Sequence, residues 1–269
     1  MALSNGTETN GKVRHVMGLS GGKDSTALAI FMRGKIQDIE YVFCDTGAEL
    51  PETYEYLDKL ESYLGQRITR LNSDLSFETL LQNYGGYLPS PQARWCTKSM
   101  KLVPLERFFG NDTVYSYIAI RADERREGYV STKPNVIPVF PFKEAGITIG
   151  DVQKILDEAG IGLPKYYEWR SRSGCYFCFF QRKEEWVGLL ERHPDLFEKS
   201  KRMEKVLPDG KAYTWVKGRD LSYIEKNREK IILDAKKRQA EALANKRKTT
   251  LFEQFSQKQD DDGCLVCEL

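Results

Sequence analysis

The hexapeptide Ser-Gly-Gly-Lys-Asp-Ser at residues 20–25 combines residue types that bind phosphate. It follows a short apolar run, residues 13–19, that predicts a buried strand, and it precedes a segment with helical composition, residues 25–33. Backbone amides and the positive end of a helix dipole would converge on an anion there, and the glycines leave room for it. Lys23 adds a positive charge, and the serines add hydroxyl donors. The segment is therefore predicted to be a phosphate-binding loop.

Two other interpretations of this loop are weaker. The Walker A motif requires Gly at position 17 and Ser or Thr after the lysine, whereas this chain has Met17 and Asp24. A tight turn without a ligand would need only one glycine, not the whole set of glycines, hydroxyls, lysine and aspartate.

Five cysteines have a spacing that suggests metal binding. Cys175 and Cys178 are separated by two residues, so one turn can bring both thiolates to a single metal. Cys264 and Cys267 repeat this spacing, and Cys96 stands alone. Four thiolates from this set could hold a structural zinc ion or a [4Fe-4S] cluster, and the spacing alone does not choose between them.

The elements that must position these residues alternate between strand and helix. Strands are predicted at 13–19, 39–44, 68–72 and 114–120, and helices at 25–33 and 51–64. Such alternation implies right-handed βαβ units and an α/β fold with a doubly wound, mostly parallel sheet. Sites in these sheets lie beyond the carboxyl ends of the strands. Asp45 and Arg121 follow two of those ends, so both are candidates for contacts with a phosphate ligand; Asp45 could instead cap its own turn.

The remainder of the chain is predicted to be mainly helical and to carry the cysteines. A charged, proline-rich loop at 122–141 precedes a helix that starts near Thr148, with Asp151 as its capping partner. Further helices are predicted at 183–192, 195–206 and 221–248. The predicted domains are a disordered N-terminus (1–12), a nucleotide-binding α/β domain (13–145), a helical region with cysteines and basic residues (146–248) and a cysteine tail (249–269).

The composition is that of a soluble globular protein. The chain has 269 residues, 41% of them hydrophobic, and no apolar run near the ~20 residues that a bilayer span needs. The N-terminal residues do not resemble a secretory signal, so a cytoplasmic location without membrane contact is expected. Thiols are kept reduced there, which favours metal binding or catalysis over disulfides. Cys44, inside an apolar strand, is predicted to be a core residue.

The net charge of +2 hides an uneven distribution. Residues 199–248 contain 16 Lys and Arg against 7 Asp and Glu, whereas residues 249–269 contain 1 against 5. The basic triplets at 236–238 and 246–248 suit contacts with a nucleic-acid backbone, although such helices are often simply solvated. Arg125 and Arg126 could likewise contact a phosphate or pair with neighbouring carboxylates.

The loop resembles the pyrophosphate-binding loop of the ATP pyrophosphatase superfamily, whose members cleave ATP between the α and β phosphates. The order of the motifs over residues 13–205 is similar to that of the phosphoadenosine-phosphosulfate-reductase-like family. The motifs are the loop, residues 44–49, Arg94-x-Cys96-Thr97, residues 101–104, residues 120–124, Gly174-Cys175-x-x-Cys178 and Trp186.

The resemblance implies roles for the loop residues. ATP would be the ligand, with its pyrophosphate portion held by Ser20, Gly21, Gly22, Lys23, Asp24 and Ser25. Asp24 would help to position Mg²⁺. Lys23, Asp24 and Asp45 are the predicted catalytic residues of the nucleotide site, and Asp45 and Arg121 complete the predicted nucleotide contacts.

Members of this family with this cysteine pattern carry a [4Fe-4S] cluster, which the resemblance favours over Zn²⁺. Cys96, Cys175 and Cys178 are then ligands, and we assign the fourth position to Cys267 as a hypothesis. Cys264 would be a catalytic, mobile sulfur carrier. The alternative is that both tail cysteines form an unligated end.

Two departures separate this chain from assimilatory sulfonucleotide reductases. Reductases with a cluster have two adjacent cysteines where this chain has only Cys96, and they end in Glu-Cys-Gly-Leu-His, whereas this chain ends in Cys-Leu-Val-Cys-Glu-Leu. The pattern is more similar to the ATP pyrophosphatase component of DNA phosphorothioation systems, which acts with a cysteine desulfurase and other modification-system subunits. That function is predicted, with DNA as substrate. The alternatives are a sulfonucleotide reductase, a tRNA thiolation enzyme and a non-enzymatic ATP-binding scaffold that recruits sulfur-transfer partners.

Overall fold

The computed structural model describes residues 11–126, 133–207, 210 and 212–248. Contacts divide them into two compact units. The first unit contains the described residues up to Asp74 together with Thr97–Lys165. The second contains Leu75–Cys96 and the described residues from Tyr166 onward. Each unit is therefore assembled from two separate stretches of chain.

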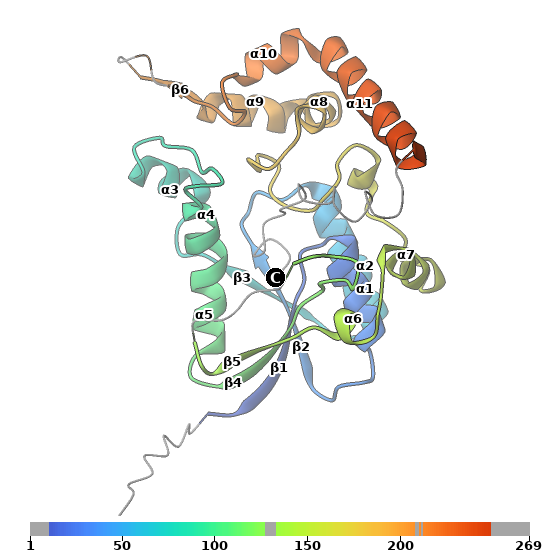
Figure 1. Ribbon diagram of the computed structural model, residues 1–269. Helices are drawn as coiled ribbons and strands as arrows, with labels where there is room; N and C mark the ends of the chain where they lie inside the picture. Colours follow the sequence, from blue (N-terminus) through green and yellow to red (C-terminus); the bar gives the residue numbers. More distant parts are fainter. Residues whose placement is uncertain (1–10, 127–132, 208–209, 211, 249–269) are drawn as a thin grey trace, which may run out of the picture. The chain divides into compact units, whose positions relative to one another are not determined.

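A five-stranded parallel sheet forms the centre of the first unit (Figure 1). Its strands are β1 (Val13–Gly18), β2 (Ile39–Asp45), β3 (Ile68–Asn72), β4 (Thr113–Tyr117) and β5 (Val136–Val139), in the order β3-β2-β1-β4-β5. β1 is flanked by β2, with His15 opposite Ile39, and by β4, with Val13 opposite Thr113. The chain changes direction across the sheet between β1 and β4, and doubly wound sheets bind ligands beyond the strand ends at such a point.

Helices cover both faces of this sheet. Figure 1 shows α1 (Lys23–Met32), α2 (Pro51–Leu64), α6 (Pro141–Glu144) and α7 (Ile149–Glu158) on one face and α5 (Val103–Phe109) on the other. Right-handed crossovers explain this, because the connections through α1 and α2 run one way across the sheet and the connection through α5 returns. Leu28, Leu60, Phe142 and Leu156 are fully buried in the core under α1 and α2. Such a core fixes the carboxyl ends of β1 and β4.

The second unit is mainly helical. Its elements are α3 (Phe77–Asn83), α8 (Lys183–Arg192), α9 (Pro194–Met203), the antiparallel pair β6 (Lys205–Val206) and β7 (Ala212–Tyr213), α10 (Leu221–Lys226) and α11 (Arg228–Lys248). Its core is aromatic: the Phe77 ring lies 4.0 Å from Phe177, Phe177 lies 5.3 Å from Trp215, and Trp215 lies 6.1 Å from Trp186. Each such ring contributes a large buried area, so these contacts hold the two stretches of this unit together.

Three short segments lie in the sequence at or next to the points where the chain passes from one unit to the other. They are α4 (Trp95–Thr97), the π-helical turn η1 (Lys98–Leu102) that leads into α5, and the 3₁₀ turn η2 (Lys165–Glu168). None of the helices in the described part of the chain combines the length and apolar composition that a membrane span requires.

The α/β sheet and most of the predicted elements are confirmed. The strand predicted at 68–72 and the helix predicted at 183–192 have the observed bounds. The predicted capping pair is also present, since the Thr148 backbone N–H donates to Asp151 Oδ2 at 2.8 Å. The fourth strand ends earlier than predicted, at Tyr117.

Three predictions about elements were wrong. The single helix at 221–248 is broken at Asn227, whose side chain donates to the Tyr223 carbonyl at 2.9 Å and ends α10. The helix predicted at 195–206 ends at Met203, and its last residues form β6. The loop at 122–141 contains β5, an edge strand of the sheet that accommodates Pro138 because one side needs no partner.

The predicted domain ranges place a boundary at residue 145, whereas the contacts group α7 with the sheet and place Leu75–Cys96 in the second unit. The physical reasons are local. Leu156 of α7 is buried in the core beneath α1, while Phe77 and Trp95 stack at 5.1 Å within the aromatic core of the second unit.

Candidate nucleotide site

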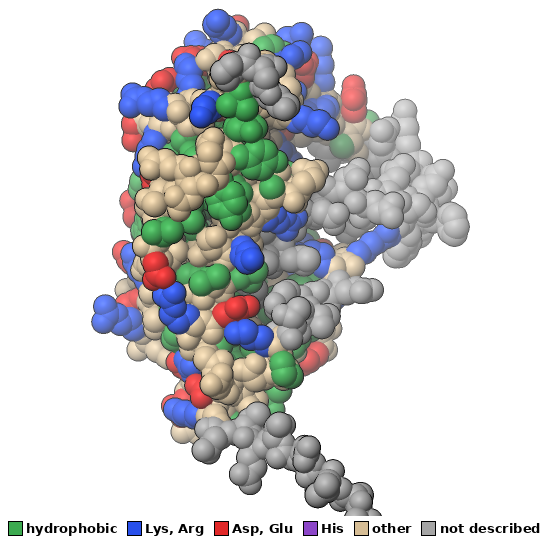
Figure 2. Space-filling view, turned by 90° about the vertical axis from the view of Figure 1, so that its left-hand side faces the viewer, with side chains coloured by type: hydrophobic (Ala, Val, Ile, Leu, Met, Phe, Trp, Pro, Cys, Tyr) green, Lys and Arg blue, Asp and Glu red, His purple; other side chains and the backbone are tan. Residues whose placement is uncertain are grey.

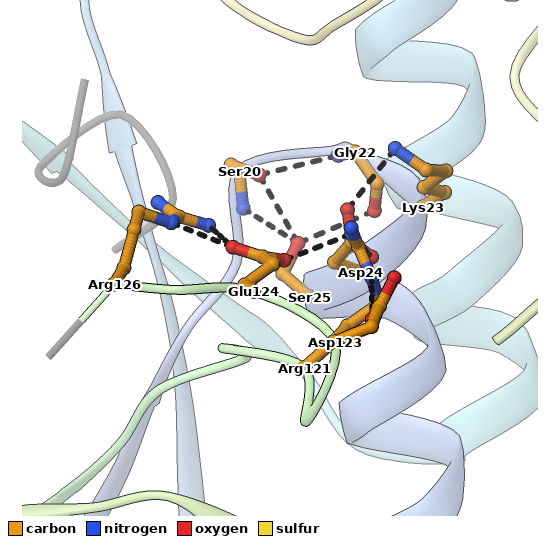
Figure 3. Close-up of polar contacts among 9 residues, drawn as sticks. All are labelled: Ser20, Gly22, Lys23, Asp24, Ser25, Arg121, Asp123, Glu124 and Arg126. Atoms are coloured by element: carbon orange, nitrogen blue, oxygen red, sulfur yellow. Dashed lines mark hydrogen bonds and ion pairs between the residues drawn. The ribbon is translucent and has the colours of Figure 1, made fainter. Parts of the chain in front are cut away.

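The predicted phosphate loop connects β1 to α1 (Figure 3). It follows the strand from which the chain adds β2 and β3 on one side and β4 and β5 on the other. Two serines close the loop on itself: Ser25 Oγ lies 3.1 Å from Ser20 Oγ and accepts the Ser20 backbone N–H at 3.1 Å. The Gly22 N–H donates to Ser20 Oγ at 3.3 Å. Gly22 is the N-cap of α1 and supplies no side-chain cap, so the first turn of the helix presents backbone amides and the positive end of its dipole.

Gly21 is required by both conformation and space. Its φ is +69°, in the left-handed region that favours glycine. A Cβ atom at this position would lie 2.6 Å from Thr53 Cγ2, and Thr53 is a buried residue of α2. The loop therefore passes so close to α2 that only glycine fits, which leaves its backbone uncovered by a side chain of its own.

Asp24 connects the loop to the strand on the other side of the switch point. Its two carboxylate oxygens contact two cations: Lys23 Nζ lies 3.1 Å from Oδ2, and Arg121 Nη1 lies 2.7 Å from Oδ1. Arg121 comes from the segment after β4, and Figure 3 shows it reaching toward α1. The sequence predicted that Lys23, Asp24 and Arg121 share one site, and the structure brings all three together.

Further carboxylates surround Arg121. Its guanidinium lies 3.0 Å from Asp123 Oδ1 and 2.9 Å from Glu124 Oε1, and Glu124 also accepts a hydrogen bond from Arg126 Nε at 2.6 Å. Burial disfavours the charge of Arg121, but Asp24 and Glu124 outweigh it and raise the pKa of Arg121 above its ordinary value. Arg121 therefore stays positively charged.

The charges drawn in Figure 3 balance: Lys23, Arg121 and Arg126 face Asp24, Asp123 and Glu124. A polyphosphate entering this site gains net attraction only if the arginines exchange partners or a divalent cation enters with it. Carboxylate oxygens are suitable ligands for Mg²⁺, so these residues fit a magnesium–nucleotide complex.

Asp45 has a different environment from the loop. Its Oδ1 accepts the Gly47 backbone N–H at 2.9 Å and the Tyr54 hydroxyl at 2.8 Å. Burial and this bond to Asp45 raise the pKa of Tyr54. Asp45 thus caps the turn after β2, one of the two roles that the sequence left open, and its predicted contact with nucleotide stays a prediction.

The described cysteines divide between the units. Cys44 is buried in β2 of the first unit, as predicted for a core residue. Cys96, Cys175 and Cys178 all belong to the second unit, where the rings of Trp95 and Phe177, their chain neighbours, both contact Phe77. The predicted sulfur carrier and fourth ligand, Cys264 and Cys267, lie outside the described residues.

Among the described residues, no group of three or more His, Cys, Asp or Glu side chains is placed to hold a metal ion. Cys96, Cys175 and Cys178 therefore do not form a metal site by themselves in this arrangement. The turn that contains two of them is nevertheless well fixed: the Cys178 N–H donates to the Cys175 carbonyl at 3.0 Å.

Sequence reasoning missed two residues that support this turn. Arg170, 2% exposed, donates to the Gly174 carbonyl at 2.9 Å and to the Cys175 carbonyl at 2.8 Å. Glu185 accepts from the Ser171 N–H at 2.8 Å and from the Arg182 N–H at 3.0 Å. Only the spacing of Arg182 and Glu185, that of a capping box, could have indicated the second contact.

Comparison with known proteins agrees with this geometry. Residues 14–179 match the phosphoadenosine phosphosulfate reductase domain, which is more than half of the chain. This chain belongs to that family. The five-stranded parallel sheet of the first unit, with helices on both faces, is the α/β fold that the resemblance to this family implied.

Three proteins are similar to parts of this chain. An uncharacterized protein of Methanocaldococcus jannaschii is 29% identical over 198 residues, which cover 68% of this chain and 40% of that protein. The tRNA-specific 2-thiouridylase of Actinobacillus succinogenes is 29% identical over 137 residues, 44% of this chain and 34% of that enzyme. The phosphoadenylyl-sulfate reductase of Candida auris, solved as a phosphate complex, has a TM-score of 0.47 and 15% identity, covering 60% of this chain and 81% of that one. The chain spans less than half the length of the archaeal relative.

Proposed function

We propose that this chain cleaves ATP between the α and β phosphates and transfers AMP to a phosphate of a DNA backbone, which activates that phosphate for sulfur insertion. The observation that carries the proposal is the contact of Arg121 with Asp24 at the phosphate loop. It places a permanent cation and a carboxylate beside the amides of α1, where charge would develop on a leaving pyrophosphate.

The chemistry requires two displacements. A non-bridging oxygen of the DNA phosphate attacks the α phosphorus of ATP, the bond to the bridging oxygen breaks, and pyrophosphate leaves with the electron pair. A sulfur nucleophile then attacks the activated DNA phosphorus, and AMP leaves with the original oxygen. If the sulfur arrives as the persulfide of a cysteine desulfurase, a thiol must supply two electrons to release the phosphorothioate.

Residues of the loop have distinct roles in this proposal. Backbone amides around Gly21 and Gly22 would hold the leaving pyrophosphate, and Lys23 and Arg121 would neutralise it. Asp24 would orient both cations and bind Mg²⁺, which supplies charge stabilisation when present. Asp45, in the turn after β2, would contact the nucleotide at the edge of the site.

A thiolate-bound cofactor also belongs to the proposal. Support comes from the sequence spacing of Cys96, Cys175 and Cys178 and from their location in one unit. The proposed cofactor is a [4Fe-4S] cluster, with Zn²⁺ as the alternative, and no step above depends on it. Iron and zinc content of anaerobically purified protein, compared with that of Cys96→Ser, tests this part separately.

The main experiment measures pyrophosphate and AMP formed from ATP and Mg²⁺ with no acceptor, DNA, tRNA or a sulfonucleotide. Release that depends on DNA supports the proposal, and Lys23→Ala should remove it while the exposed-surface control Lys154→Ala should not. Sulfite release from the sulfonucleotide without pyrophosphate would instead identify a reductase. ATP binding without any turnover would identify a scaffold.

Thiolation of tRNA is a second candidate, favoured by one observation. The 2-thiouridylase of Actinobacillus succinogenes is 29% identical to this chain over 137 residues. In that case pyrophosphate release would depend on tRNA rather than DNA: a base oxygen would attack the α phosphorus of ATP, and the same loop residues would hold the pyrophosphate that leaves.

A further inference from the structure

The second unit exposes two tyrosines next to a lysine, which we call the tyrosine platform (Tyr84, Tyr87 and Lys205). Tyr84 is 46% exposed and Tyr87 is 39% exposed, both large fractions for aromatic side chains. Figure 2 shows hydrophobic side chains gathered on this side of the molecule at the level of α3 and the β6–β7 pair. Such a concentration on a protein surface commonly marks a binding site.

The rings of this platform are held rigidly from beneath. Tyr84 stacks on Trp95 with ring centroids 4.8 Å apart and planes 13° apart, and Trp95 stacks on Phe77 at 5.1 Å. Trp95 and Phe77 are buried, and Trp95 Nε1 donates to the Tyr87 carbonyl at 3.1 Å. Tyr84 is therefore the outermost ring of a continuous stack, and its side chain needs little reordering to accept another flat ring.

A cation lies beside the two tyrosines. The stem of Lys205 passes over Gly86, where an added Cβ would lie 3.2 Å from Lys205 Cδ and 3.7 Å from Nζ. Lys205 is exposed and takes part in none of the ion pairs found among the described residues. Its charge is thus available at the platform.

The nearby carboxylates are already engaged. Glu78 of α3 pairs with Lys199 at 3.0 Å, which lowers the pKa of Glu78 despite the opposing effect of burial. Glu204 accepts the Trp215 N–H at 3.0 Å and the Leu221 N–H at 2.8 Å. Neither carboxylate pairs with Lys205 among the described residues, so the Lys205 ammonium can contact an anion at the platform.

We infer that the tyrosine platform binds an unpaired base of a nucleic-acid strand, with the base stacked on Tyr84 and the adjoining phosphate contacted by Lys205. A flat ring beside a cation matches the combination of base and phosphate, because every base offers a π face and every nucleotide an anion. The inference rests on the proposed function, whose substrate it specifies as a strand with at least one unstacked base.

The test measures binding in the absence of ATP. A labelled single strand of about 15 nucleotides, within the usual site sizes, is titrated as DNA and as RNA, and the matching DNA duplex is titrated in parallel. The wild type should prefer the single strands, and Tyr84→Ala should weaken this binding about fivefold or more. Tyr84→Phe should retain affinity, since it keeps the ring.

Tyr167 provides a matched control, because it also stacks on a neighbouring ring, Tyr166, at 5.0 Å in the same unit. Tyr167→Ala should leave binding unchanged. Lys205→Ala should reduce the slope of log affinity against log salt by about 0.7, the value for one phosphate contact to a single strand. If Tyr84→Ala unfolds the protein, Tyr84→Leu replaces it with the same expected loss, because it keeps an apolar side chain over Trp95 and removes the aromatic face.

Unchanged affinity in folded Tyr84→Ala, an equal loss in Tyr167→Ala, or a loss of duplex binding in Tyr84→Ala as large as the loss of single-strand binding would each overturn the inference. A wild type that binds no oligonucleotide would overturn it as well and would leave the surface to a protein partner. Because the binding test contains no ATP, the two proposals can fail separately. Single-strand binding that depends on Tyr84 without any DNA-dependent pyrophosphate release contradicts only the proposed function. DNA-dependent pyrophosphate release without Tyr84-dependent binding contradicts only the inference about the platform.

Discussion

Arg121 and Asp24 are 97 residues apart in the sequence, yet Arg121 Nη1 lies 2.7 Å from Asp24 Oδ1. The two residues follow β4 and β1, which are neighbours in the sheet, and the contact spans the point where the chain changes direction. The fold thus places a second cation beside a phosphate loop whose own sequence, residues 20–25, contains one cationic side chain, Lys23. This relationship can be tested by changing either side chain.

Replacing Arg121 should weaken ATP binding. The variant Arg121→Ala changes the balanced charge around the loop to a net negative one, so we expect the KM for ATP to rise at least tenfold, or about 1.4 kcal/mol. Arg121→Lys keeps the charge but not the planar set of guanidinium donors, so its KM for ATP should lie between the values of the wild type and Arg121→Ala. Steady-state pyrophosphate release measures both.

A matched control for this change is Arg107→Ala. Arg107 pairs with Asp74 at 2.7 Å, with both side chains well exposed, in the same unit. The control should leave the KM for ATP unchanged, since exposed pairs contribute little. Equal effects of Arg107→Ala and Arg121→Ala would show that general charge, rather than the contact with Asp24, is responsible.

The phosphate loop could be predicted from the sequence because the features that indicate it are local. An apolar run, two glycines and a helix start occupy residues 13–33, and each feature constrains its immediate neighbours. The position of Arg121 followed from the rule that parallel strands end at one edge of a sheet. Both predictions needed only the order of strands and helices.

Features that depend on contacts between distant residues could not be predicted in this way. The stacking of Trp95 on Phe77 and the bonds from Arg170 to two carbonyls have no periodic pattern. The break at Asn227 arises because its side chain competes for the Tyr223 carbonyl, an option that composition does not reveal. β5 was hidden because Pro138 argues against a strand unless the strand lies at an edge.

The variant Gly21→Ala should disrupt the loop more than backbone strain alone can. Gly65, with φ +67° and open space around its missing Cβ, provides the comparison, and Gly65→Ala should cost about 1 kcal/mol. Gly21→Ala adds a clash with Thr53 Cγ2 at 2.6 Å, so its loss of unfolding free energy should be larger by about 1–3 kcal/mol. Urea denaturation measures both losses.

Thr53→Ser offers a rescue, because it removes Cγ2 and keeps the hydroxyl. The double variant Gly21→Ala/Thr53→Ser should recover most of the extra loss. A double variant no more stable than Gly21→Ala would show that the clash is not with this methyl group.

Cys44 should resist alkylation in the folded protein. Burial raises the pKa of its thiol to about 11, so almost no thiolate is present at pH 8. Because the folded state holds this proton more tightly than the unfolded chain does, the resulting stability is present below pH of about 8.5 and is lost as the pH rises toward 11. Peptide mass spectrometry after iodoacetamide treatment should find Cys44 modified only when urea is present. Modification of the native protein at the unfolded rate would contradict this assignment.

Arg170 should control the order of the turn that contains Cys175 and Cys178. Its guanidinium is buried and donates to the carbonyls of Gly174 and Cys175, so Arg170→Met leaves both acceptors without these donors. We expect a loss of about 3 kcal/mol in the free energy of unfolding and faster amide hydrogen exchange at residues 174–178. Arg192→Met is the control, because Arg192 is half exposed and lies 3.6 Å from Glu168. If the amides of residues 174–178 exchange at the wild-type rate in Arg170→Met, the hydrogen bonds of Arg170 do not control the order of this turn.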